Sequence, residues 1–324
     1  MRRKPFILRH FAPFCLILPL IFLCACAENS QIPAQTKEIS APFSQNLPDI
    51  PQNPAGKAEK TFENPAGKFE NRPENGSERS VLVLMYHHLD PHPASWGDYV
   101  ISPDLLEADL RLLKEKGYQT VPLSALVSFS EGVGELPEKP LIITFDDGQE
   151  SVYAYALPLL AKVGFTGAAA VVGSLADAYT AAPDHNLRYS YMDWEEIGRL
   201  DFGGILEPVC HSYDMHKLSP RRGCDRMPGE SAAHYKAALN ADFSAFRAAF
   251  EAHLGHGTDC LALPYGAYQS QTVTLARAAG FRVIFTCEEK QNTLCAGTGE
   301  LPLLGRFNRP AGETSEEFFR RIGA

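Results

Sequence analysis

Positive charge, closely paired cysteines and long apolar runs are all scarce in this sequence. Its 30 Lys and Arg residues are outnumbered by 39 Asp and Glu residues, for a formal net charge of −9, so a nucleic-acid partner is not expected. None of its eight cysteines belongs to a Cys-x-x-Cys pair, which argues against a zinc site built from thiolates. The apolar run Phe11 to Leu23 is short for a membrane span and is interrupted by Pro13 and Pro19.

Residues 1–25 have the pattern of a secretory signal. A basic region of Arg and Lys precedes the apolar run, which is the order of a signal peptide. The run ends in Leu23-Cys24-Ala25-Cys26, a segment that resembles a bacterial lipobox. The resemblance implies cleavage before Cys26 and lipid attachment to its thiol, and one lipidated residue would hold the protein to a membrane. Ordinary cleavage near Ala25 or Ala27, or an uncleaved anchor, are the alternatives.

The predicted mature chain is therefore exported and lipid-anchored. Ala27, not Asp, follows the lipidated cysteine, which in a Gram-negative cell favours the outer membrane. Removal of residues 1–25 takes away four basic residues, so the net charge changes from −9 to −13. Five thiols remain besides Cys26. In an oxidising compartment a Cys287–Cys295 bridge is possible, and Cys210 and Cys260 are expected to be buried and free.

Residues 26–80 have the composition of a disordered tether. They are rich in Pro, Asn, Gln, Glu, Lys and Gly, and Asn53-Pro54-Ala55-Gly56-Lys57 recurs as Asn64-Pro65-Ala66-Gly67-Lys68. Such a segment has too few apolar side chains to build a core. As a flexible coil it would span roughly 40 Å, enough for an anchored domain to reach nearby polymer.

From Val81 onward, apolar strand patterns alternate with helix patterns. This alternation predicts parallel βα units, and about seven or eight units in residues 81–324 favour a distorted (β/α)7–8 barrel; an open doubly wound sheet is the alternative. The predicted strands cover 81–86, 141–145, 167–172, 205–210, 261–263, 282–286 and 303–307, and the predicted helices cover 102–116, 151–163, 193–200, 231–254, 270–279 and 315–322.

Four of these strands are followed by polar or turn-forming residues. His87-His88 follow the first strand, Asp146-Asp147-Gly148 the second, His211 a later one, and Pro264-Tyr265-Gly266 another. Because the carboxyl ends of barrel strands meet on one face, these groups are expected to converge there.

Asp146 and Asp147 are the most informative pair among these residues. Two adjacent carboxylates after a buried strand are costly to desolvate unless a metal, protons or hydrogen bonds compensate. With His211 and His216 they predict a cation held by one carboxylate and two imidazoles, with the second carboxylate free to accept a proton. Separately each motif has a simpler interpretation, as a turn, a helix cap or a chance histidine pair. His185, His234, His253 and His256 are expected to be structural or solvated.

Residues 81–324 resemble the polysaccharide deacetylase (NodB-homology) family of carbohydrate esterases. The resemblance is carried by Thr144-Phe145-Asp146-Asp147-Gly148, by His211-Ser212 and by Pro264-Tyr265-Gly266. The His-x4-His spacing of His211 and His216, with Met85-Tyr86-His87 after the first strand, is similar to the branch that acts on poly-β-1,6-N-acetylglucosamine.

The resemblance implies a role for each of these residues. Asp147, His211 and His216 would bind a divalent metal, zinc in the first place, although cobalt, nickel and iron also suit such ligands. Asp146 would be the general base, and the backbone N–H of Tyr265 would stabilise the oxyanion. The implied reaction removes acetate from N-acetylglucosamine units of a surface polysaccharide. Peptidoglycan or chitooligosaccharide deacetylation, or glycan binding by a catalytically impaired lipoprotein, are the alternatives.

The sequence departs from the family pattern at two places. Leu304-Gly305-Arg306 stands where many members have a Leu-x-His motif that supplies the general acid, and arginine is a poor proton donor. His87 is therefore the candidate general acid, with His88 second. Leu261 stands where the family has an arginine that tethers the base, so Arg306 is the candidate residue to orient Asp146.

Overall fold

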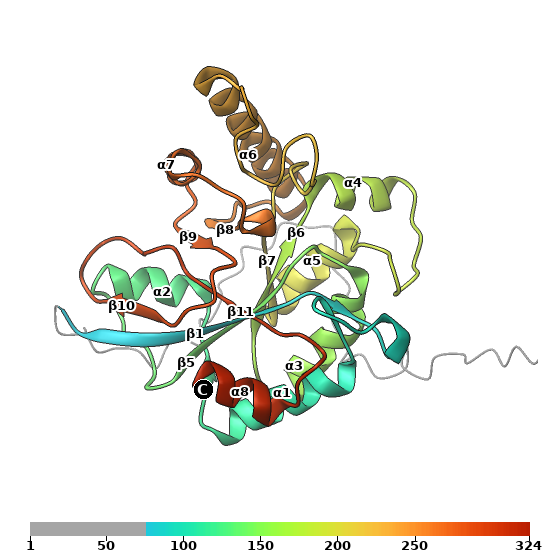
Figure 1. Ribbon diagram of the computed structural model, residues 1–324, viewed down its shortest axis with the longest axis vertical. Helices are drawn as coiled ribbons and strands as arrows, with labels where there is room; N and C mark the ends of the chain where they lie inside the picture. The colour runs from blue at the N-terminus through green and yellow to red at the C-terminus, as the bar shows by residue number, and fades with distance from the viewer. Residues whose placement is uncertain (1–75) are drawn as a thin grey trace, which may run out of the picture. The chain divides into compact units, whose positions relative to one another are not determined.

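The structure is a computed structural model that describes residues 76–324 (Figure 1). The predicted signal segment, the predicted lipidation site Cys26 and most of the predicted tether lie outside the described residues. Within them the first strand begins at Glu78, before the Val81 expected from the sequence, because exposed residues Glu78 to Ser80 pair with a later strand. No helix between residues 76 and 324 combines the length and the apolar character that a membrane crossing requires.

The strands form one large sheet and a separate two-stranded pair. The strands are β1 Glu78–Tyr86, β2 His88–Leu89, β3 Val100–Ile101, β4 Gln119–Thr120, β5 Pro140–Phe145, β6 Gly167–Val171, β7 Leu206–Cys210, β8 Cys260–Ala262, β9 Val283–Phe285, β10 Asn292–Cys295 and β11 Phe307–Asn308. The large sheet has the order β10-β1-β5-β6-β7-β8-β9, with β4 on β5 and β11 on β1. All pairings are parallel except that of β10 with β1.

The two ends of the sheet are joined by the short segment 304–308. Leu304 forms a parallel bridge with Phe285 of β9, and β11 pairs with β1 in the register Leu84 to Phe307. The sheet therefore curls into a distorted barrel, as the alternation of elements predicts, and the open doubly wound alternative is wrong. This closing segment carries Arg306 into the interior of the curled sheet.

Helices surround the sheet and cover its outer face. They are α1 Pro103–Glu115, α2 Leu123–Ser130, α3 Leu157–Val163, α4 Gly173–Ala181, α5 Trp194–Gly203, α6 Ala232–Leu254, α7 Ser270–Ala278 and α8 Ser315–Ile322, with a π-helical turn at Val152–Ala156 and 3-10 turns at Pro93–Ser95 and Pro264–Gly266. Figure 1 shows α1, α3 and α8 together on one side, and α6 with α7 on another. Side-chain caps mark several starts, such as Ser102 of α1 and Thr314 of α8.

Both faces of the central strands are buried, which explains their continuous apolar sequences. In β1, Leu82, Leu84 and Tyr86 belong to the cluster that packs against the outer helices. The alternate residues Val81 and Val83 belong to a second cluster, which α2 and β10 help to enclose. The same alternation in β5 directs Ile142, Thr144 and Asp146 toward the interior side, where the polar residues of the next section lie.

Candidate active site

Three residues with positive φ angles shape the strand ends where the polar residues gather. Among residues 76–324, the non-glycine residues with positive φ are Asp147 at 74°, Ser212 at 73° and Tyr265 at 57°. Each lies in a motif that the sequence singles out. Such backbone conformations cost about 1–3 kcal/mol each and persist where the surrounding structure imposes them. The turn at Asp147 lets two successive carboxylates serve one site, although strand alternation would send them to opposite faces.

The glycines of two motifs permit close packing around these turns. Gly148 has a φ of 74°, and an added Cβ would lie 3.1 Å from Val171 Cα. Gly266 has a φ of 58°, and an added Cβ would lie 2.8 Å from Cys287 Cβ. A larger residue would be strained at either position. The Asp-Asp-Gly and Pro-Tyr-Gly sequences are therefore required by backbone geometry as well as by chemistry.

Asp147, His211 and His216 lie together as a set of metal-ligand atoms. One atom from each lies within 4.8 Å of the others. Asp147 Oδ1 is 3.0 Å from His216 Nε2 and 3.5 Å from His211 Nε2. Two ligands of a tetrahedral ion at about 2.1 Å are about 3.4 Å apart. Burial alone would raise the pKa of Asp147, but the two imidazoles hold it well below the usual value, so this carboxylate is an anion available to a cation.

The two histidines are oriented by groups behind the site. His211 Nδ1 lies 2.9 Å from the Ala262 carbonyl oxygen, so Nδ1 donates and Nε2 is left with a lone pair that faces Asp147. A carbonyl in this position is the usual partner of a metal-binding imidazole. The ring of His216 stacks on Tyr265 with a centroid distance of 4.6 Å. This donor set of two nitrogens and one oxygen fits a divalent transition ion.

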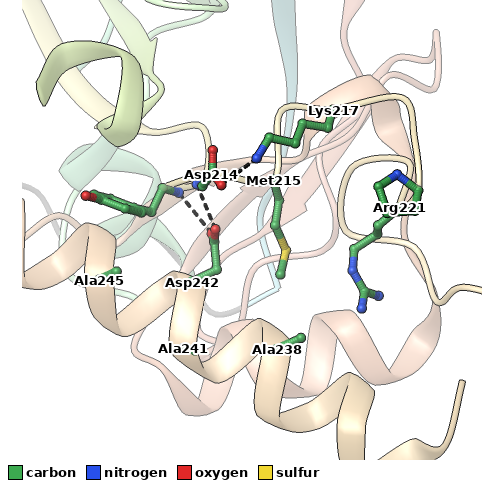
Figure 2. A pocket seen from close by; sticks show the side chains of 10 residues that line it. Asp214, Met215, Lys217, Arg221, Ala238, Ala241, Asp242 and Ala245 are labelled. Atoms are coloured by element: carbon green, nitrogen blue, oxygen red, sulfur yellow. Dashed lines mark hydrogen bonds and ion pairs between the residues drawn. The ribbon is translucent and has the colours of Figure 1, made fainter. Parts of the chain in front are cut away.

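The loop that carries both histidines is tied to helix α6. Asp242 of α6 accepts hydrogen bonds from the backbone N–H groups of Tyr213 and Asp214 at 2.9 and 2.8 Å. Figure 2 shows these contacts beside a pocket of about 420 Å³, into which Met215 projects between Lys217 and Arg221. A helix could not align two histidines five residues apart, and this anchored loop does so.

Arg306 holds Asp146 by a buried, two-pronged ion pair. Its two terminal nitrogens lie 2.6 and 2.7 Å from the two carboxylate oxygens, and both side chains are almost fully buried. Thr144 Oγ1 and the Thr286 carbonyl accept further hydrogen bonds from the guanidinium. Burial alone would raise the pKa of Asp146, but Arg306 and His211 lower it below the usual value. Asp146 is therefore an oriented carboxylate that is ionised at neutral pH.

His87 lies at the end of β1 beside this acidic pair. Its ring meets the exposed ring of Tyr99 edge-on at a centroid distance of 4.8 Å, and its Nδ1 is buried with no hydrogen-bond partner among the described residues. Burial lowers the pKa of His87, and the charges of Asp146 and Asp147 oppose that shift. His88 turns the other way, with its Nδ1 2.9 Å from Ser151 Oγ. Of the two, His87 is the one that Asp146 and Arg306 influence.

Several supporting residues cannot be identified from the sequence alone. Ala262 and Asp242 act through contacts that join segments 28 to 51 residues apart, and no local pattern marks them. Thr144 lies in the Asp-Asp-Gly motif, but its contact with Arg306, 162 residues away, is not visible in that motif. The structure brings all the predicted site residues, Asp146, Asp147, His87, His211, His216, Tyr265 and Arg306, to one end of the curled sheet.

The cysteines at 210, 224, 260, 287 and 295 are all free, so the possible Cys287–Cys295 bridge is absent.

The curled α/β barrel carries two imidazoles and a carboxylate at its strand ends, next to a second, oriented carboxylate. This is the arrangement of a metal-assisted hydrolase. Residues 133–284 match the model of the family described as polysaccharide deacetylase. The match spans a little under half of the 324-residue chain and identifies a polysaccharide deacetylase domain in that segment.

Individual relatives share a modest fraction of the sequence. The chain is 22% identical over 238 residues to the poly-beta-1,6-N-acetyl-D-glucosamine N-deacetylase of Escherichia coli K12, covering 67% of this chain and 34% of that protein. It is 23% identical over 197 residues to the Staphylococcus aureus MRSA252 protein of the same name, covering 60% and 64%. The structure of IcaB from Ammonifex degensii superposes with a TM-score of 0.59 and 24% identity over 77% of this chain and 97% of that one, which shows a shared fold. The chain thus spans about a third of the E. coli relative.

Proposed function

We propose that this protein is a metal-dependent hydrolase that removes N-acetyl groups from N-acetylglucosamine units of an extracellular polysaccharide and releases acetate. The observation that carries the proposal is the placement of Asp147, His211 and His216 within 4.8 Å of one another, directly beside Asp146 in its contact with Arg306. The relatives named for poly-β-1,6-N-acetylglucosamine favour that polymer as the substrate. The segment Leu23-Cys24-Ala25-Cys26, which resembles a lipobox, supports export and attachment to a membrane.

Each residue of the site has a task in this reaction. Asp147, His211 and His216 would hold a divalent ion, zinc in the first place, which when bound activates water and polarises the acetyl carbonyl. Asp146 accepts a proton from the attacking water, and Arg306 keeps its carboxylate in position. The backbone N–H of Tyr265 donates to the oxygen that becomes negatively charged. His87 donates a proton to the departing amine, because an amide anion cannot leave near neutral pH.

The substrate is tested by acetate release from defined oligomers. We expect the full chain to release acetate faster from β-1,6-linked than from β-1,4-linked N-acetylglucosamine oligomers of equal length, and a chelator to abolish both rates. Mass spectrometry of the products counts the acetyl groups lost. A preference for β-1,4 oligomers would favour the chitooligosaccharide alternative, and no release from either would support the glycan-binding alternative.

The role of His87 is tested with substrates that differ in their leaving group. We expect His87→Asn to slow acetate release from an N-acetylglucosamine oligomer by about 10²–10⁴-fold. The same variant should slow hydrolysis of 4-nitrophenyl acetate much less, because nitrophenolate leaves without a proton. His88→Asn is the matched control and should leave the ratio of the two rates unchanged. Equal losses on both substrates with His87→Asn would show that His87 does not act as the general acid.

A further inference from the structure

A second group of metal-ligand side chains lies outside the active site. Glu150, His185 and Glu196 each place one ligand atom within 4.8 Å of the other two. Glu150 precedes the π-helical turn at Val152–Ala156, His185 lies in the loop after α4, and Glu196 is in the first turn of α5. None of the three takes part in the proposed reaction. His185, which the sequence predicts to be structural or solvated, is 59% exposed and also contacts Glu150.

The carboxylate of Glu150 is buried with one oxygen unpaired. Glu150 is 5% exposed, and its Oε1 lies 2.9 Å from His185 Nδ1. Its Oε2 is also buried and accepts no hydrogen bond from the described residues. An ionised oxygen in this position loses hydration without a replacement, so the geometry calls for a positively charged partner.

Glu196 brings a second buried carboxylate to the same place. It is 8% exposed, and its Oε2 accepts from the Asp193 N–H at 3.3 Å in the capping box of α5. Burial, together with the charges of Glu150 and Asp193, raises the pKa of Glu196 to about 7. Among the ion pairs of residues 76–324, no Lys or Arg pairs with Glu150 or Glu196. Among the described residues, the cationic group in an ion pair with these two carboxylates is His185, which contacts Glu150, when it is protonated.

A second His–Glu pair shows what a fully satisfied carboxylate looks like in this protein. His234 Nδ1 lies 2.6 Å from the buried Glu230, and the exposures of the two side chains, 67% and 2%, are close to the 59% and 7% of His185 and Glu150. Glu230, however, also accepts from Arg221 and from the Met227 N–H. The two pairs differ in their third member. The Glu230–His234 pair has the cation Arg221, whereas the Glu150–His185 pair has a second carboxylate, Glu196.

We propose that Glu150, His185 and Glu196 form a second divalent-cation site. One imidazole and two carboxylates suit a transition ion such as Zn²⁺ or Mn²⁺, whereas Ca²⁺ prefers oxygen ligands alone. The exposed face of His185 leaves room for water to complete the coordination.

An ion here would fasten the loop at residues 184–193 to the loop that carries the catalytic aspartates. Backbone hydrogen bonds already join these segments, from Glu150 N–H to the Ser190 carbonyl and from Met192 N–H to the Gly148 carbonyl, both at 2.9 Å. Glu150 is three residues after Asp147. The ion would therefore stabilise the backbone that continues from the Asp146-Asp147 motif.

The proposal is tested by zinc and manganese binding to the untagged full chain carrying Asp147→Asn and His216→Ala, in which two of the three active-site ligands are removed and only His211 is left. Isothermal titration calorimetry should still find one ion per chain, and saturating ion should raise the Tm by about 5 °C or more. Adding His185→Ala or Glu150→Gln should weaken binding of the ion by more than about 100-fold. Loss of a residue that only orients a metal ligand typically weakens binding by roughly 10–100-fold. His234→Ala, the matched control, should leave binding unchanged.

Absence of binding to the Asp147→Asn/His216→Ala chain, or equal binding after His185→Ala, would overturn the proposal. His185 is largely exposed, so His185→Ala remains informative if Glu150→Gln fails to fold. Because two of the three active-site ligands are absent throughout, the outcome does not depend on whether the chain is a deacetylase.

Discussion

Asp146→Asn is expected to reduce acetate release by about 10²–10⁴-fold while the chain still binds one ion at the active site. The carboxamide has nearly the shape of the carboxylate but cannot accept a proton from water, and general-base catalysis contributes about that factor. Asp146 is not one of the three grouped metal-ligand residues, so the ion should remain. Acetate release and metal content, measured on the same preparation, check both halves of the expectation.

Two matched variants separate the tasks of the adjacent aspartates. Asp147→Asn should lose the ion as well as the activity, because Asp147 lies between both histidines. Asp214→Asn changes an exposed carboxylate in the same loop region as His216 and should change neither by more than a few-fold. Full activity in Asp146→Asn would assign the base to another residue.

Arg309→Met is expected to destabilise the protein by about 3–5 kcal/mol, because it leaves a buried charge without a partner. Arg309 Nε lies 2.8 Å from Asp109 Oδ2, and both side chains are fully buried. Tyr86 also donates to that carboxylate, at 3.1 Å. The pair joins α1 to the segment after β11, so urea denaturation followed by circular dichroism should report the loss as a lower midpoint.

Arg321, a partly exposed arginine that lies over the same phenylalanine ring as Arg309, supplies the control. Arg309 and Arg321 both lie over Phe318, at 4.7 and 5.1 Å from its centroid, but Arg321 pairs with the partly exposed Glu313. Arg321→Met should therefore cost no more than about 1 kcal/mol. Equal effects of the two substitutions would show that the buried charge is not the cause.

The loss in Arg309→Met should shrink as the pH falls. Burial raises the pKa of Asp109, and Arg309 opposes that shift. Without the arginine, the folded-state pKa lies further above the unfolded value of about 3.9. The loss of folding free energy in Arg309→Met is therefore complete above the folded-state pKa of Asp109. It decreases as the pH falls from that pKa to the unfolded-state pKa, and it is absent below the unfolded-state pKa.

The sequence predicts much of this fold because its strongest signals are local. Continuous apolar runs such as 81–86 and 141–145 become strands buried on both faces, and capped amphipathic stretches such as 315–322 become helices. Helices α2 and α4 and strand β10 are not among the elements predicted from the sequence. Helix α2, Leu123–Ser130, has only eight residues and buries Leu123, Leu126 and Val127 on one side, so its periodic signal is too short to stand out in the sequence.

The site follows the same division between local and long-range information. Asp146, Asp147, His211 and His216 stand in short motifs after strands, and parallel topology brings strand ends together. The contact of Arg306 with Asp146 spans 160 residues and follows from the way segment 304–308 closes the sheet. The Asp242 anchor and the grouping of Glu150 with Glu196 likewise depend on how helices pack. No spacing along the chain encodes them.

The most direct test is acetate release by the metal-free chain as zinc is returned. The chain, stripped by a chelator and assayed on a β-1,6-linked N-acetylglucosamine oligomer, should release no acetate and should recover its rate when zinc is added. His211→Ala, stripped and supplied with zinc in the same way, should not recover. Sustained acetate release by the stripped chain, or full recovery by His211→Ala, would contradict the assignment of Asp147, His211 and His216 as the metal-binding center of a deacetylase.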